Sequence, residues 1–156
     1  MTRPFPAKAV LVFAKPPRPG HVKTRLRSVL TAQQAAELHL ACVQDTARMV
    51  ASAGGYRKWL LVAGRFAGAQ QLARLAQLSS RWCLGVQVGR DLGARLEFAF
   101  GSHFTAGVRK VVIVGTDTPW MGAERILRCH GFAPLGGYPG NKSIASFCPP
   151  PCRNIS

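Results

Sequence analysis

Four cationic side chains lie close together near the N-terminus, in a stretch that reads VLVFAKPPRPGHVKTRL over residues 10–26. Arginine offers phosphate oxygens a two-pronged set of N–H donors, lysine offers a point charge, and backbone amides near a glycine allow close approach. The residues that supply these features are Lys15, Arg18, Gly20, Lys23 and Arg25. The stretch therefore predicts a phosphate-binding loop, with a solvent-exposed basic turn as the alternative. Its spacing is neither that of a Walker A loop nor G-x-G-x-x-G.

An aspartate follows the apolar segment KVVIV, in the turn Gly-Thr-Asp-Thr-Pro. This residue, Asp117, is one of only six acidic residues, which restricts the choice of a metal-binding carboxylate. Mg²⁺ prefers hard oxygen ligands and takes few of them from protein, the others coming from water and phosphate. We interpret Asp117 as a ligand for Mg²⁺ that bridges a diphosphate and neutralises it as a leaving group. A turn in which the carboxylate accepts hydrogen bonds from nearby backbone amides explains the same residues equally well.

A third group of polar residues lies in the segment GRDLGAR. Asp91 is predicted to cap the N-terminus of a helix, with Gly93 in its first turn and Arg95 within reach of a ligand. A helix N-terminus also attracts anions, so capping and ligand binding are compatible.

The histidines and cysteines predict less chemistry. His39 is expected to pack on a long helix rather than to act in catalysis. Cys129, His130, Cys148 and Cys152 match no common zinc-ligand spacing. The five cysteines are odd in number and irregularly spaced, which favours reduced thiols over a disulfide framework.

The composition indicates one domain with an anionic partner. A chain of 156 residues can bury a real core. The formal net charge of +15 favours nucleic acid, phosphorylated metabolites or an acidic membrane surface, unless it reflects only a compositional drift toward arginine on a solvated face. No apolar run approaches the roughly 20 residues of a membrane-spanning helix, and the N-terminal run is too short for a secretory signal, so we expect a cytoplasmic protein.

Strands and helices are expected to alternate. Buried strands are predicted at 8–14, 59–63, 83–88 and 110–114, and helices at 32–52 after a Thr31 cap, 67–78, 92–104 and 124–129. This order implies an α/β fold with a mostly parallel sheet covered on both faces. Ligands of such sheets bind beyond the carboxyl ends of the strands, where both the basic loop and the Asp117 turn are expected. Whether the two are neighbours is left open by the sequence.

Residues 131–156 differ in amino-acid composition from the rest of the chain. They hold five prolines and four glycines and keep neither helix nor strand periodicity. We expect an irregular or poorly ordered tail.

Three segments resemble a known family: FAKPPRPGHVKTRL, RDLGARLEFAF and VVIVGTDTPWM, in this order. The chain is similar over about residues 9–127 to small bacterial glycosyltransferase-like proteins, formerly a domain of unknown function and related to nucleotidyltransferases of cofactor biosynthesis. The resemblance implies a Rossmann-like three-layer sandwich of GT-A type. It also implies a nucleoside diphosphate sugar or nucleoside triphosphate donor, and Mg²⁺ or Mn²⁺ as cofactor. The positions that match the family motifs are Lys15, Gly20, Lys23, Thr24, Arg25, Asp91, Gly93, Arg95 and Asp117.

The chain departs from that family after about Arg128. Family members continue with a strand and a G-P-x-x-D-G-G-Y-Y-like motif that carries a further acid, whereas this chain has LGGYP at 135–139. We therefore expect residues 1–130 to form an incomplete nucleotide-diphospho-sugar transferase-like domain. Residues 131–156 would be an irregular, C-terminally truncated tail, which a change of reading frame would explain.

The function expected from these observations is metal-assisted transfer from a nucleotide-activated donor. Glycosyl transfer is favoured over nucleotidyl transfer, and the acceptor is not indicated. Asp117, Lys23 and Arg25 are the expected catalytic residues. The expected donor-binding residues are Lys15, Arg18, Gly20, Thr24, Asp91, Gly93 and Arg95. The alternatives are a basic nucleic-acid-binding protein, although no recognised DNA or RNA module is present, and a remnant that only binds nucleotide.

Overall fold

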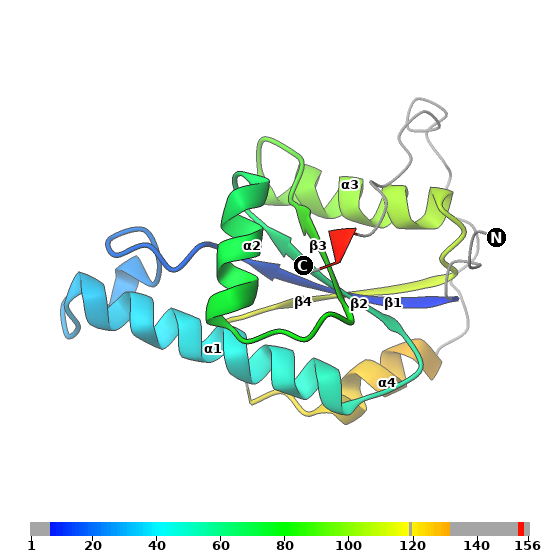
Figure 1. Ribbon diagram of the computed structural model, residues 1–156, viewed down its shortest axis with the longest axis horizontal. Coiled ribbons are helices and arrows are strands. Elements are labelled where there is room, and N and C mark those ends of the chain that lie inside the picture. The colour runs from blue at the N-terminus through cyan, green and yellow to red at the C-terminus, as the bar shows by residue number, and fades with distance from the viewer. Residues whose placement is uncertain (1–6, 119, 132–152, 155–156) are drawn as a thin grey trace.

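The computed structural model describes residues 7–118, 120–131 and 153–154, and its centre is one twisted sheet (Figure 1). The strands are β1 (Lys8–Ala14), β2 (Arg57–Val62), β3 (Trp82–Val86), β4 (Lys110–Gly115) and β5 (Arg153–Asn154). Their order across the sheet is β4-β1-β2-β3-β5. The first four strands are parallel, as the alternation of strands and helices predicted, and the two-residue β5 is antiparallel to β3.

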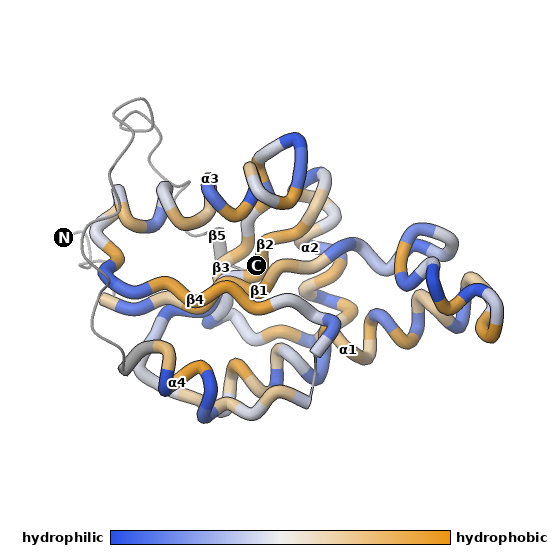
Figure 2. Tube along the Cα trace, turned by 180° about the vertical axis from the view of Figure 1, so that it is seen from behind, coloured by the Kyte–Doolittle hydropathy of each residue, from blue (hydrophilic) through white to orange (hydrophobic). Residues whose placement is uncertain are grey.

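Strand β1 lies at the middle of the parallel part and pairs with a strand on either side. Its register sets Phe13 opposite Gly115 of β4, and Ala14 opposite Val62 of β2. Residues 9–14 are all buried, which explains why this segment is continuously apolar instead of alternating. Figure 2 shows the apolar residues concentrated along these central strands.

In the described part of the chain, four helices and one short 3₁₀ turn accompany the sheet. They are η1 (Thr24–Leu26), α1 (Ala32–Ser52), α2 (Phe66–Leu75), α3 (Leu92–Thr105) and α4 (Ala123–Gly131). The larger core joins α1, α2 and α4 to one face, through residues such as Val43, Leu72 and Ile126. The smaller core includes Ala99 of α3. Figure 2 shows α3 on the opposite side of the sheet from α1 and α4. The three-layer α/β architecture is therefore confirmed.

The predicted elements are all present, with end positions that differ by a few residues. The second strand begins at Arg57, and the fourth strand includes Gly115. Within the tail that was expected to be irregular, the described residues Arg153 and Asn154 pair with Leu84 and Cys83. Two residues carry no periodicity, so no sequence pattern could show this pairing. Residues 132–152 lie outside the described residues. They include the LGGYP segment at 135–139 and most of the tail that was predicted for 131–156.

The cap of α1 has the predicted residue. Thr31 Oγ1 accepts a hydrogen bond from Gln34 N at 3.2 Å, and Gln34 Oε1 accepts one from Thr31 N at 2.9 Å. This reciprocal pair satisfies two backbone donors and forms a capping box. It fixes where α1 starts, just after the loop that follows β1.

Two further observations concern the described part of the chain. Cys42, Cys83 and Cys129 are free thiols there. None of its helices combines the length and the apolar character that crossing a membrane requires.

Replacing Thr31 by alanine removes the side-chain half of the capping box. We expect Thr31→Ala to lower the free energy of unfolding by about 1 kcal/mol, measured by urea denaturation. Thr31→Ser keeps an oxygen at the same place and is the matched control. Equal destabilisation by both variants would show that the hydroxyl is not what stabilises the start of α1.

Candidate functional site

A cleft of about 940 Å³ lies at the carboxyl ends of β1, β3 and β4. Its walls come from the ends of these strands, from the loop and 3₁₀ turn after β1, from His39 of α1 and from the start of α3. This is the edge at which parallel α/β sheets bind ligands. Figure 1 shows the loop after β1 leaving the sheet beside the N-terminal end of α1.

The cleft gathers most of the predicted site residues. Those that line it are Lys15, Lys23, Thr24, Arg25, Asp91, Arg95 and Asp117. Three others are not part of its lining: Arg18, Gly20 and Gly93. Arg18 is exposed in the loop, and Gly20 has a φ of 82°, a left-handed conformation that favours glycine. Gly20 therefore shapes the loop through its backbone.

The basic loop and the Asp117 turn are neighbours. Lys23 Nζ lies 3.1 Å from Asp117 Oδ1, although the two residues are 94 positions apart in the sequence. The lysine side chain is 15% exposed and the aspartate side chain 83% exposed. One partner is thus largely enclosed and the other faces solvent, so the carboxylate is accessible to a ligand entering the cleft.

The backbone at Lys23 is unusual. Its φ of 46° and ψ of 40° are left-handed, a conformation that costs a residue with a side chain roughly 1–2 kcal/mol. The preceding Val22 is buried, whereas His21 before it is exposed. We infer that the buried valine anchors the loop while the left-handed turn at Lys23 directs the chain into η1. Backbone strain of this kind is concentrated at functional sites in proteins.

His39 holds the start of the same loop. Its side chain is 5% exposed, and Nε2 lies 2.9 Å from Lys15 O. A carbonyl oxygen only accepts, so Nε2 carries the proton and donates it. Burial lowers the pKa of His39, Lys23 and Lys15 act in the same direction, and the hydrogen bond to Lys15 O and the charge of Asp117 oppose them. His39 is packed, as expected, and it is also part of the cleft wall.

Gln87 is a cleft residue that the sequence reasoning missed. Its Nε2 donates to Ala14 O at 3.0 Å and to Leu61 O at 2.9 Å, which connects β3 to the ends of β1 and β2. Arg95 Nη1 is 3.5 Å from Gln87 Oε1. A single glutamine after a strand belongs to no motif, and only the strand order brings it beside Ala14.

The start of α3 is built as predicted. Asp91 Oδ1 accepts a hydrogen bond from Ala94 N at 2.8 Å, which confirms it as the N-cap. Arg95 Nε donates to Gly89 O at 3.0 Å, so the guanidinium is held at the cleft wall. Gly89 has a φ of 142°, and a Cβ there would lie 2.6 Å from Arg95 N. Only glycine allows the backbone to approach α3 this closely.

The carboxylates of the cleft fit a metal that shares its ligands with a phosphate. Within the described ranges, no group of three or more His, Cys, Asp or Glu side chains is arranged to hold a metal ion. Asp91 uses one oxygen to cap α3, whereas Asp117 is accessible. Mg²⁺ accepts one or two carboxylates together with water and substrate phosphates. Asp117 can therefore supply the carboxylate of such a site, with water and phosphate as the other ligands. The described side chains do not supply a complete set of metal ligands by themselves.

Comparisons with known proteins agree with this geometry. The family model described as "uncharacterized protein conserved in bacteria (DUF2064)" matches residues 30–131. The structure is similar to a protein from Desulfovibrio desulfuricans G20, described as a proposed nucleotide-diphospho-sugar transferase, with a TM-score of 0.70 and 30% sequence identity. The similarity covers 78% of this chain and 52% of that one, so this chain spans about half the length of its structural neighbour. No curated protein matches the sequence.

These comparisons support a GT-A-like family, as the sequence motifs indicated. The matched range ends with α4, near the point where the sequence departs from the family pattern. It begins after the basic loop, so the role predicted for that loop rests on its own residues and on the structure.

Acidification should destabilise the protein through its buried histidines. Burial lowers the pKa of both His39 and His103, so the unfolded chain binds protons more readily than the folded one. Their contribution to stability is complete above the ordinary histidine pKa of about 6.5 and is lost as the pH falls below it. We expect the free energy of unfolding to fall from pH 7 to pH 5 in denaturant titrations.

The variant His39→Gln isolates one of the two groups. Its amide can still donate to Lys15 O, and the pH slope should decrease by at most about 1.4 kcal/mol per pH unit. Thr31→Ser, which changes no titratable group, is the control and should leave the slope unchanged. An unaltered slope in His39→Gln would show that His39 does not contribute to the pH dependence of stability.

Proposed function

The chain belongs to the DUF2064 family of bacterial proteins, and from this premise we propose that it binds the diphosphate of a nucleotide-activated donor in the cleft, as a transferase of GT-A type. The observation that carries the proposal is the 3.1 Å contact between Lys23 and Asp117. It joins the expected phosphate loop to the expected metal-binding turn across one cleft. The solvent-exposed basic turn, which was the alternative, does not account for this convergence.

The charge of the cleft supports an anionic ligand. Among the described residues, five cationic side chains line it, against two carboxylates. They are Lys15, Lys23, Arg25, Arg90 and Arg95, with Asp91 and Asp117 as the acids. A concave surface with an excess of one charge concentrates ligands of the opposite charge. The diphosphate of a nucleotide sugar is a ligand of that kind.

Lys23 and Asp117 would exchange partners when the donor binds. A Mg²⁺ or Mn²⁺ ion held by Asp117 would offset the charge of the departing nucleoside diphosphate. Lys23 Nζ contacts Oδ1 of Asp117, and a cation bound to that carboxylate would repel the ammonium and favour its release. The released ammonium would then bind a phosphate oxygen, and Arg25 lines the same wall to add a second contact. The ion pair therefore keeps both groups in position before the ligand arrives.

The proposal favours glycosyl over nucleotidyl transfer. The structural neighbour's description names nucleotide-diphospho-sugar transfer, and we extend that donor class to this chain as a proposal. Because the chain spans about half of that protein, the acceptor is not assigned. The geometry of the cleft therefore supports binding of the donor and does not by itself support its turnover.

Thermal unfolding with a panel of nucleoside diphosphate sugars and nucleoside triphosphates, with and without Mg²⁺ or Mn²⁺, tests donor binding. At a ligand concentration 100 times Kd we expect Tm to rise by about 5–10 °C. Asp117→Ala and Lys23→Ala should remove most of this rise. Asp45→Ala is the control, because Asp45 pairs with Arg48 in an exposed contact outside the cleft. No shift with any nucleotide, or shifts that survive both cleft substitutions, would refute the proposal.

The exchange of partners makes a second, more specific prediction for Lys23→Met. Mn²⁺ alone should bind this variant about two- to five-fold more tightly, because the lysine ammonium no longer competes for the solvent-facing carboxylate of Asp117. A nucleoside diphosphate with Mn²⁺ should bind it about ten-fold or more weakly, because a charge-assisted hydrogen bond is lost. Isothermal titration measures both, with Arg48→Met as control. Changes of the same sign for metal and nucleotide would contradict the exchange.

A titration with duplex DNA separates the transferase from the nucleic-acid-binding alternative. Nucleic-acid binding would be steeply salt-dependent, indifferent to Mg²⁺ and unaffected by Asp117→Ala. Nucleotide binding by the proposed transferase should instead depend on Mg²⁺, vary less steeply with salt and be lost in Asp117→Ala.

A further inference from the structure

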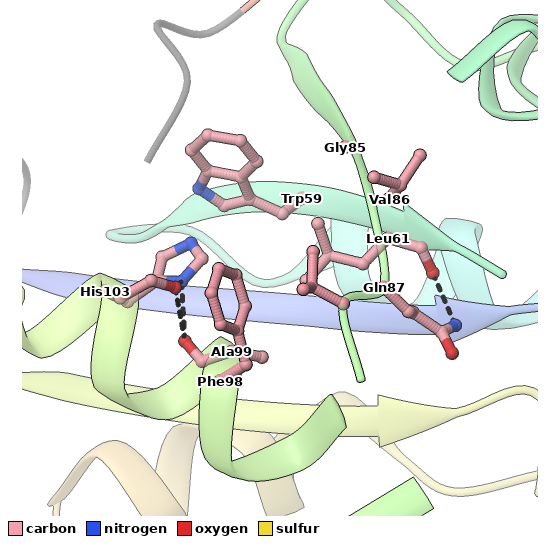
Figure 3. A pocket seen from close by; sticks show the side chains of 10 residues that line it. Trp59, Leu61, Gly85, Val86, Gln87, Phe98, Ala99 and His103 are labelled. Carbon is pink, nitrogen blue, oxygen red and sulfur yellow. Dashed lines mark hydrogen bonds between the residues drawn. The ribbon is translucent and has the colours of Figure 1, made fainter. Parts of the chain in front are cut away.

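Gln87 lies at the point where three parallel strands end together. It follows Val86, the last residue of β3, and its backbone N–H donates to Val62 O of β2 at 3.0 Å. Its side chain reaches further, because Nε2 donates to Leu61 O at 2.9 Å (Figure 3) and to Ala14 O of β1 at 3.0 Å. One residue therefore joins the carboxyl ends of β1, β2 and β3 at the edge where the cleft lies.

The orientation of the Gln87 side-chain amide follows from these contacts. A carbonyl oxygen only accepts hydrogen bonds, so the amide must present its NH₂ group to Ala14 O and Leu61 O. The opposite orientation would set three oxygens against one another. The amide oxygen, Oε1, is therefore left to face Arg95, whose Nη1 lies 3.5 Å away. Hydrogen bonds in ligand-free sites are often long and tighten in the complex.

Arg95 is held at two points. Its Nε donates to Gly89 O at 3.0 Å, and its Nη1 approaches Gln87 Oε1. A guanidinium has five N–H groups, and in the described chain these contacts take two of them. Three remain, which is enough for a two-pronged contact with a phosphate. Both Gln87 and Arg95 line the cleft, so the guanidinium borders the space that a ligand would fill.

We propose that Gln87 is a positioning residue for phosphate binding: it fixes the Arg95 guanidinium at the cleft wall and ties it to the end of β1, where the basic loop begins. This role rests on the proposed function, because it requires a diphosphate in the cleft. A carboxylate at the same place would offset the charge of Arg95 and would have no N–H to donate to Ala14 O or Leu61 O. The neutral amide holds the arginine and leaves its positive charge to the ligand.

A double-mutant cycle with inorganic pyrophosphate and Mg²⁺ tests this role, because the probe carries the diphosphate without a base or a sugar. In isothermal titrations we expect Gln87→Met to weaken binding about five-fold, and Arg95→Met about ten-fold or more. The double variant should lose no more than Arg95→Met alone, because Gln87 acts through the arginine. Gln44→Met is the matched control. It removes a glutamine hydrogen bond to a backbone carbonyl, Leu75 O, outside the cleft, and should leave the affinity unchanged.

An equal loss from Gln87→Met in the presence and absence of Arg95 would overturn the proposal, since a glutamine that only joins the strands would weaken binding alike in both backgrounds. Full affinity in Gln87→Met would refute it as well. Either result leaves the proposed function standing where Asp117→Ala still abolishes pyrophosphate binding. A wild-type protein that binds no pyrophosphate refutes the positioning role, and the nucleotide panel then decides the proposed function by itself.

NMR spectra of the ligand-free wild type provide a measurement that does not depend on the folding of Gln87→Met. Rotation of the Arg95 Nη1 group about its C–N bond should be slower than in Arg18, which is exposed in the basic loop. The Arg95 signals are assigned by their absence in Arg95→Met. Rotation as free as in Arg18 would show that Gln87 does not hold the guanidinium, and would overturn the proposal.

Discussion

Parallel pairing of β1 with a strand on each side is the constraint on which the rest of the molecule depends. Residues 9–14 are buried on both faces, so this strand must be apolar throughout and must lie inside the sheet. Its two neighbours, β2 and β4, come from segments roughly 50 and 100 residues further along the chain. The pairing therefore brings distant loops to one edge, and the contact between Lys23 and Asp117 exists because of it.

Much of the fold could be predicted because its signals are local. Continuous apolar runs marked the parallel strands, Thr31 marked the start of α1, and Asp91 marked the start of α3. The candidate site was accessible to the same reasoning only in part. Loop chemistry indicated Lys23 and Asp117 separately, but their contact depends on the order of strands in the sheet, which no local pattern states.

What the sequence could not show depends on single residues without a motif. Gln87 and His39 become cleft residues because the fold carries them to the ends of β1, where each binds a backbone carbonyl. The short pairing of β5 with β3 had no signal either.

The register of β1 against β4 also has a geometrical consequence for any ligand. Phe13 is opposite Gly115, so the basic loop and the Asp117 turn leave the sheet at nearly the same position along the strand direction. Adjacent strands are separated by about 4.8 Å, a spacing set by backbone hydrogen bonds and not by side chains. The width between the two loops at their roots is therefore independent of the residues within them. Substitutions in either loop can change which ligand the cleft prefers while the separation of the two loops at the sheet stays constant.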